Sequence, residues 1–139
     1  MTPESLAAVG LHHEQTGPVA SITLDRPDVR NAQTPAMWRG LAELGASLPE
    51  ETRVVVVRGA GHSFSAGLDR SMLDPTATAE GVESVAGLLT MSDGEMAATI
   101  DAYQQGFTFL RDPRFISIAG RTSLSPSKVV RTSTRASGT

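Results

Sequence analysis

The sequence predicts an α/β fold, in which helices cover a sheet that contains parallel strands. Two observations lead to this prediction: an apolar strand pattern over residues 19–24 precedes an amphipathic helix, and that helix precedes four consecutive valines, Val54–Val57. A run of β-branched residues without alternation is typical of a strand that is covered on both faces by helices. Strand, helix and strand in this order form a right-handed crossover, which makes the two strands parallel.

The first expected elements are two short strands joined by a tight turn. Residues 9–14 alternate loosely between apolar and polar side chains, and residues 19–24 are rich in β-branched and aliphatic ones. Between them, Gly17 permits a positive φ and Pro18 cannot donate to a strand ladder, so the segment has the chemistry of a turn. The pattern predicts an antiparallel hairpin.

The next element is a helix that begins after Thr34 and ends near Pro49. Thr34 is a favourable N-cap, and Pro35 suits the first helical position because its missing N–H has no partner there in any case. One face of the helix is apolar, with large side chains at helical spacing. These side chains are Met37, Leu41, Leu44 and Leu48.

A second helix is expected after residue 92, followed by another apolar strand over 115–119. Ser92 and Glu95 have the spacing of a capping box, which satisfies free amides at the start of a helix. Asp112 and Pro113 end the pattern. The apolar face of this helix consists of Met96, Ile100, Tyr103, Phe107 and Leu110.

Composition excludes several classes of protein. The chain has 139 residues, which fits one domain or part of one, and its net charge of −3 argues against a general nucleic-acid binder. Without cysteine it has no disulfides, thiol nucleophile or cysteine-ligated zinc. The longest aliphatic run is four residues, far below the ~20 that a membrane span needs, and no signal peptide is visible. We therefore expect a soluble cytoplasmic protein that binds neither nucleic acid nor membrane.

Charge divides the chain into two parts. Residues 1–119 hold all fifteen acidic residues and eight arginines, a balance of −7, whereas residues 120–139 hold four basic residues and no acidic one. We expect residues 1–119 to form the folded part and the Ser/Thr-rich residues 120–139 to be a disordered basic tail, because the tail has few apolar side chains to bury. The alternatives are a basic arm for nucleic acid or membrane and the product of a lost reading frame.

The most informative segment is the glycine-rich loop that follows the valines. A dinucleotide-binding fingerprint fails because Phe64 stands where its third glycine belongs. A nucleophile elbow fails because Ser65 replaces its second glycine. A phosphate-binding P-loop fails because it needs a Gly-Lys-Ser/Thr end, and the only lysine, Lys128, lies in the tail. Neither Ser63 nor Ser65 has a partner base within reach in the sequence.

Residues 66–69 form the candidate site. Gly67 lets the backbone approach a ligand closely, and Asp69 is a good N-cap for a short helix. The amide of Leu68 would then be free and near the positive end of a helix dipole, where it could stabilise a developing oxyanion. Such a turn, taken alone, is more often structural than catalytic. Asp69 could also be considered a base, but the N-cap position favours a structural role.

The motifs together resemble the enoyl-CoA hydratase/isomerase (crotonase) superfamily over residues 6–119. The resemblance depends on their order and spacing more than on any single motif. The matching segments are 22–27 (Ile-Thr-Leu-Asp-Arg-Pro), 30–32 (Arg-Asn-Ala), 54–61, 64–69 (Phe-Ser-Ala-Gly-Leu-Asp) and 115–119.

The resemblance implies the N-terminal half of a ββα spiral, incomplete in this chain, that binds acyl-CoA thioesters. Such enzymes stabilise an enolate with two backbone N–H groups, and the first corresponds to that of Leu68. Arg30 would lie near the CoA phosphates, although a solvated loop charge is an equal alternative, and Ala32 would lie near the thioester. The remaining CoA contacts would come from Ala66, Gly67, Leu68, Asp69, Arg70 and Ser71.

The sequence departs from the family after Ala119. It has no Gly-rich turn there for the second N–H donor and no acidic residue after Asp112 for acid–base catalysis. We therefore expect acyl-CoA binding with little or no turnover by this chain; the alternative is a non-catalytic CoA-binding or interaction fragment.

The resemblance also bears on cofactors, metals and assembly. No cofactor is expected, since CoA enters as part of the substrate. No metal site is expected either, because the adjacent His12 and His13 point to opposite faces of a strand. The resemblance implies a homo-oligomer, a trimer or a hexamer, assembled through segments later than residue 119. We do not extend that expectation to this chain, which departs from the family after Ala119.

Overall fold

The computed structural model describes residues 1–74 and 83–121, which form a four-stranded sheet and its covering helices. The strands lie in chain order across the sheet. The first two are antiparallel and the second and third are parallel, as the hairpin and the crossover predict; the fourth strand is also parallel to the third. The α/β class is confirmed. The strands are β1 (Leu11–Thr16), β2 (Val19–Leu24), β3 (Val54–Gly59) and β4 (Ile116–Arg121).

Four α-helices and three short 3-10 turns accompany the sheet in the described ranges. The predicted N-cap Thr34 and the capping box of Ser92 and Glu95 are confirmed. The first helix was not predicted, because six residues are too few for an apolar periodicity to show. The helices are α1 (Pro3–Ala8), α2 (Pro35–Ser47), α3 (Val85–Leu88) and α4 (Asp93–Thr108), and the 3-10 turns are η1 (Pro27–Val29), η2 (Arg70–Leu73) and η3 (Phe109–Arg111).

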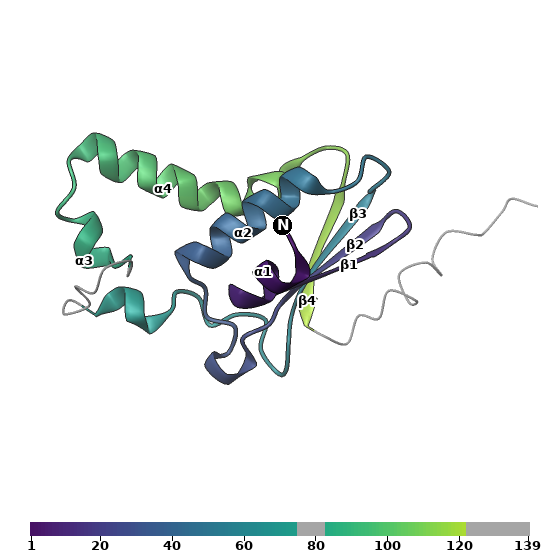
Figure 1. Cartoon of the computed structure of the whole chain (residues 1–139), viewed down its shortest axis with the longest axis horizontal. Coiled ribbons are helices and arrows are strands. Elements are labelled where there is room, and N and C mark those ends of the chain that lie inside the picture. Colours follow the sequence, from purple (N-terminus) through teal and green to yellow (C-terminus); the bar gives the residue numbers. More distant parts are fainter. Residues whose placement is uncertain (75–82, 122–139) are drawn as a thin grey trace, which may run out of the picture.

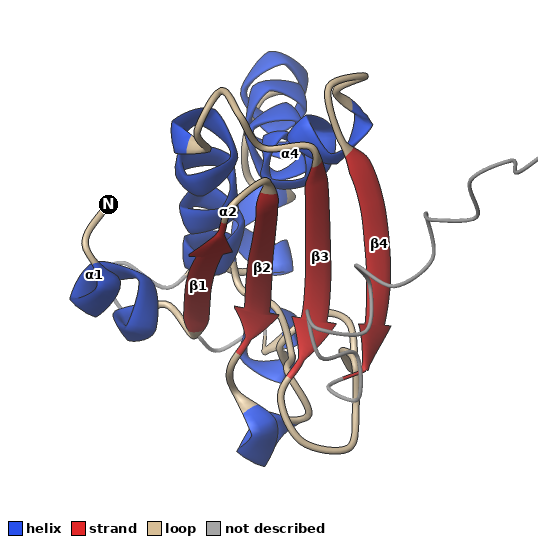
Figure 2. Ribbon diagram, turned by 90° about the vertical axis from the view of Figure 1, so that its right-hand side faces the viewer, coloured by secondary structure: helices blue, strands red, loops and turns tan. Residues whose placement is uncertain are grey.

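Helices α2 and α4 pack side by side on one face of the sheet (Figures 1 and 2). Val55 and Val57 face them and belong to the hydrophobic core, whereas Val56 points to the opposite face beside Ser21. In the described part of the chain, α2 and α4 therefore cover one face of β3, not both as the valine run predicted. Val56 is nevertheless 3% exposed, which explains why a continuous apolar run suits this strand.

The second apolar stripe is only partly buried. Tyr103 and Leu110 pack against the core, and the Tyr103 ring lies 4.9 Å from that of Trp38. Ile100 and Phe107, expected in the same stripe, are 40% and 39% exposed. Helical spacing predicts which residues share a face but not how far along its length that face is covered.

Replacing Gly106 with Ala is expected to weaken the packing of α4 on α2. A Cβ atom at Gly106 would lie 2.7 Å from the carbonyl oxygen of Trp38, so one helix must shift. Overpacking of this kind typically costs about 1–3 kcal/mol. Gly94→Ala, in the first turn of the same helix with no atom within 4 Å, serves as the control and should not destabilise the protein. Urea denaturation measures both; equal midpoints would contradict the packing argument.

The end of β4 overlaps the predicted tail. Gly120 and Arg121 pair with Arg58 and Gly59 of β3, so the strand continues two residues beyond Ala119. The rest of the predicted tail, residues 122–139, lies outside the described residues. Within the described part, none of the helices combines the length and the apolar character that crossing a bilayer requires.

Candidate functional site

Two loops at one edge of the sheet enclose the candidate site. Because β2 and β3 are parallel, their carboxyl ends lie on the same side of the sheet (Figure 2). Ligands of α/β folds usually bind at the carboxyl ends of the strands. Residues 25–34 follow β2 and residues 60–70 follow β3, and between them lies a cavity of about 470 Å³. The cavity is lined by Asp28, Val29, Arg30, Ala32, Ala66, Leu68, Asp69 and Arg70.

Most of the residues singled out in the sequence line this cavity. Gly67 lies between two of them but does not itself line the wall, and Ser71 borders a neighbouring hollow with Leu73. Asp28 and Val29 also line the cavity and were not predicted. The only sequence feature that could have indicated a place at the site is their position beside Arg30, in the loop after a strand. The predicted residues at the wall are Arg30, Ala32, Ala66, Leu68, Asp69 and Arg70.

The two loops are joined by a single parallel β-bridge between Gln33 and Leu68. The amide of Gln33 donates to the carbonyl oxygen of Gly67 at 2.7 Å, and the amide of Asp69 donates to the carbonyl oxygen of Gln33 at 2.9 Å. Gly67 has φ +86°, a left-handed conformation that L residues with side chains rarely adopt. The predicted bend at Gly67 is confirmed.

The backbone amides around Leu68 are all hydrogen-bonded except its own. The amide of Ala66 donates to the carbonyl oxygen of Arg30 at 2.8 Å, and that of Gly67 donates to Oγ of Ser65 at 3.1 Å. Asp69 donates across the bridge. The N–H of Leu68 has no hydrogen-bond partner in the described part of the chain, although Leu68 lies at the cavity wall. A ligand oxygen in the cavity could accept this hydrogen bond.

The helix expected after Asp69 is shorter than the dipole argument assumed. It is the four-residue 3-10 turn η2, with Asp69 at its N-cap. A macrodipole grows with the number of aligned peptides, so one short turn contributes little at Leu68. The chemistry available at Leu68 is therefore that of a free amide, without substantial help from a helix.

Asp69 is an anchored carboxylate, as its N-cap position predicted. It accepts from the backbone amide of Ser71 at 3.0 Å and from the Ser71 hydroxyl at 2.8 Å, and Arg26 Nη1 lies 2.8 Å from its second oxygen. The hydrogen bond from the Ser71 amide, then that from the Ser71 hydroxyl and the nearby Arg26, lower the pKa of Asp69 despite partial burial. These contacts leave Asp69 charged and structurally engaged at neutral pH.

Replacing Asp69 with Asn should destabilise the protein only where the carboxylate is charged. Its pKa is lower in the folded chain than the unfolded value of about 3.9, so its contribution is present above that value and disappears as the pH falls through the folded pKa. The unfolding free energies of the variant and the parent should differ at pH 7 and converge as the pH falls through the lowered pKa of Asp69 in the folded chain. Urea denaturation across this range measures the difference; a pH-independent difference would contradict the assignment.

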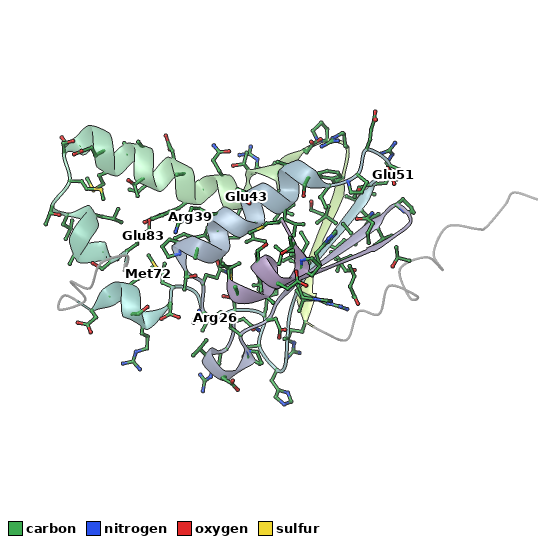
Figure 3. All side chains as sticks on the ribbon, in the orientation of Figure 1. Arg26, Arg39, Glu43, Glu51, Met72 and Glu83 are labelled. Atoms are coloured by element: carbon green, nitrogen blue, oxygen red, sulfur yellow. The ribbon has the colours of Figure 1, made fainter. Side chains whose placement is uncertain are left out.

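Arg26 connects both loops, a role that sequence reasoning missed. Figure 3 shows its side chain in the loop region below α2. Besides Asp69, the Nη1 atom of Arg26 donates to the carbonyl oxygen of Ala32 at 2.6 Å. One guanidinium thus joins a residue from each wall of the cavity. Its place in the turn after a strand and in the family motif of residues 22–27 were its signals in the sequence, and neither indicated a contact with Asp69.

Asn31 is the second connecting residue that sequence reasoning missed. Its side chain is fully buried and accepts from the backbone amide of Arg26 at 2.9 Å. Its Nδ2 group donates to the carbonyl oxygens of Ala60 and Ser63, both at 2.8 Å. Asn31 also has φ +55°, a conformation that Asn tolerates better than most residues. It therefore fixes the loop after β3 against the loop after β2.

Two arginines give the cavity its accessible positive charge. In the described part of the chain, neither Arg30 nor Arg70 forms an ion pair, in contrast to Arg26. Both line the cavity and both are exposed. An unpaired guanidinium is well suited to bind phosphate, since its planar set of donors matches two phosphate oxygens.

Comparison with known proteins shows where this architecture recurs. No family model matches the chain. It is 49% identical over 63 residues to a Mycobacterium tuberculosis protein assigned as enoyl-CoA hydratase EchA13, and 42% identical over 53 residues to the mitochondrial Δ(3,5)-Δ(2,4)-dienoyl-CoA isomerase of Mus musculus. It superposes with a TM-score of 0.76 and 42% identity on a Thermobifida fusca protein assigned as an enoyl-CoA hydratase and crystallised with acetoacetyl-CoA.

The structural match covers most of this chain and the sequence matches cover less than half of it, and all of them cover less than half of each relative. The structural match spans 85% of this chain and 45% of the Thermobifida protein. The sequence matches span 42% of this chain and 19% of the mycobacterial protein, and 37% of this chain and 16% of the mouse protein. The family resemblance inferred from the motifs is confirmed over the N-terminal part of the chain, as is the partial crotonase-like fold.

Proposed function

We infer that this chain, whose N-terminal part matches the enoyl-CoA hydratase/isomerase (crotonase) family, binds acyl-CoA thioesters in the cavity between the loops after β2 and β3. The observation that carries the inference is the free amide of Leu68 at the cavity wall, between neighbours whose amides are engaged. The acetoacetyl-CoA complex of the Thermobifida relative supports a ligand of this class.

In this proposal the Leu68 amide donates to the thioester carbonyl oxygen. The hydrogen bond strengthens as negative charge develops on that oxygen, so the amide favours an enolate over the neutral thioester. Ala32 lines the opposite wall near the reacting group, and Arg30 and Arg70 face the phosphate portion of CoA. Asp69 does not take a proton, because its oxygens are held by Ser71 and Arg26.

Binding and turnover make different demands on this chain. Loss of one oxyanion donor typically lowers a rate by about 10²–10³-fold, and loss of a positioned acid or base by about 10²–10⁴-fold. The Leu68 amide supplies one donor, and residues 113–139 contain no Asp or Glu that could supply a carboxylate after β4 begins. We therefore propose that the chain by itself binds acyl-CoA without measurable hydration, which makes a non-catalytic CoA-binding module the second candidate.

Titration calorimetry with the full chain tests binding, and loss of crotonyl-CoA absorbance tests turnover. We expect acetoacetyl-CoA to bind more tightly than CoA, since only the former offers a thioester oxygen to Leu68. Acetoacetyl-pantetheine, which lacks the nucleotide and the phosphates, should bind more weakly than acetoacetyl-CoA if Arg30 and Arg70 contact phosphate. Absence of binding by all three ligands would overturn the proposed function. Hydration above background would overturn the proposed inactivity and favour an enzyme.

A further inference from the structure

We propose that Ser65 is a positioning residue: its hydroxyl holds the bend at Gly67 so that the amide hydrogen of Leu68 faces the cavity. Gln33 and Trp38 in turn hold this hydroxyl. The inference rests on the proposed function, because it assigns Ser65 a role in how Leu68 meets a thioester oxygen. Ser65 lies in the glycine-rich loop, where it has no catalytic partner within the described residues.

All hydrogen-bonding capacity of the Ser65 hydroxyl is used. It donates to the carbonyl oxygen of Asn31 at 2.8 Å, and it accepts from the amide of Gly67 at 3.1 Å and from Nε2 of Gln33 at 3.1 Å. A serine hydroxyl has one proton and two lone pairs, so no further bond is available. These bonds join the two walls of the cavity, and they leave Ser65 unsuited to act as a nucleophile.

Trp38 sets the direction of these hydrogen bonds. Its indole Nε1 donates to Oε1 of Gln33 at 2.8 Å, and an indole N–H can only donate. Oε1 of Gln33 must therefore face Trp38, which turns its Nε2 group toward Ser65. Ser65 then accepts from Gln33, and its own proton is directed to Asn31. Trp38, on α2, is 9% exposed and its ring packs against that of Tyr103. This packing holds the indole N–H that begins the series of hydrogen bonds.

The bend needs this support because Gly67 has unusual conformational freedom. Glycine occupies left- and right-handed regions about equally, so Gly67 alone does not select the conformation at φ +86°. The bond from its amide to Ser65 holds the peptide plane before Gly67, and the bond from the amide of Gln33 to its carbonyl oxygen holds the plane after it, which carries the N–H of Leu68. Without the hydroxyl, the amide of Gly67 would also be free, and the plane before Gly67 could rotate. The orientation of the Leu68 amide toward the cavity would then depend on the Gln33 bond alone.

The test compares Ser65→Ala with Ser63→Ala in the full chain. Ser63 is the matched control, because it lies in the same loop and its hydroxyl makes no hydrogen bond in the described part of the chain. The readout is the ratio of the dissociation constants for CoA and acetoacetyl-CoA. We expect Ser65→Ala to reduce this ratio roughly 3- to 10-fold, the equivalent of one hydrogen bond. Ser63→Ala should leave it unchanged, and Ser65→Thr, which retains the hydroxyl, should restore most of the parent ratio.

Three other outcomes would overturn the inference in different ways. If the parent prefers acetoacetyl-CoA and Ser65→Ala keeps that preference, Ser65 does not position Leu68, and the proposed function stands. If Ser65→Ala weakens both ligands equally, the hydroxyl has a merely structural role. If the parent shows no preference for acetoacetyl-CoA, the proposed role of Leu68 fails together with that of Ser65. Fluorescence of Trp38, the only tryptophan, identifies a variant that has not folded.

Discussion

Replacement of Asn31 with Ala is expected to lower the free energy of unfolding by about 3 kcal/mol, the largest stability effect that we predict. The substitution removes three hydrogen bonds made by a fully buried side chain to half-buried backbone groups. It leaves the half-buried amide of Arg26 and the half-buried carbonyl oxygens of Ala60 and Ser63 without this partner, and each lost hydrogen bond typically costs about 0.5–1.5 kcal/mol. Domains have only about 5–15 kcal/mol of stability, so a large part of it depends on this side chain.

The measurement is urea denaturation followed by the fluorescence of Trp38. Gln104→Ala is the control, since Gln104 is an exposed amide residue on α4 whose side chain makes no hydrogen bond in the described part of the chain. It should change the stability by less than about 0.5 kcal/mol. Equal midpoints for the two variants would show that the network around Asn31 contributes nothing to stability.

Replacement of Gly67 with Pro is expected to abolish acyl-CoA binding. Proline fixes φ near −65°, whereas Gly67 lies at +86°, and proline also lacks the N–H that Ser65 accepts. Gly67→Ala is the milder variant. Its Cβ would meet no atom within 4 Å, so its only cost is the left-handed backbone, about 1–2 kcal/mol. Relief of that strain would turn Leu68 away, and we expect the affinity for acetoacetyl-CoA to fall roughly tenfold.

Gly17→Ala is the matched control for Gly67→Ala. Gly17 also has a positive φ, +53°, and a Cβ atom added there would likewise meet nothing within 4 Å, but it lies in the turn between β1 and β2. The two variants should lose similar stability in denaturation experiments, while only Gly67→Ala should lose affinity in calorimetry. An equal loss of affinity, or unchanged binding by Gly67→Pro, would refute the assignment of the site to this turn.

Much of the fold could be predicted because local chemistry determines it. The N-cap at Thr34, the capping box at Ser92 and the valine strand each depend on neighbouring residues or on a simple period, and each is confirmed. The bend at Gly67 and the cap at Asp69 belong to the same class. Periodicity could not predict that Arg30 and Leu68 lie at the same site. That prediction came from the resemblance to a family, and both residues line the cavity.

The contacts that assemble the site could not be predicted in this way. Asn31 reaches Ala60 and Ser63, and Arg26 reaches Asp69, across sequence separations of 29 to 43 residues. Nothing near Ser65 in the sequence indicates that its hydroxyl is held by Gln33, or that Trp38 orients that amide.

Local sequence is sufficient to place the bends of the chain, the residues that begin its two longer helices and its apolar strands, because backbone preferences and side-chain periodicity act over a few residues. Which amide stays free depends instead on contacts between distant segments. A hydrogen-bond donor becomes available at Leu68 because its neighbours are engaged by Arg30, Ser65 and Gln33. Those engagements exist only once the parallel strands β2 and β3 bring their two loops to the same edge of the sheet.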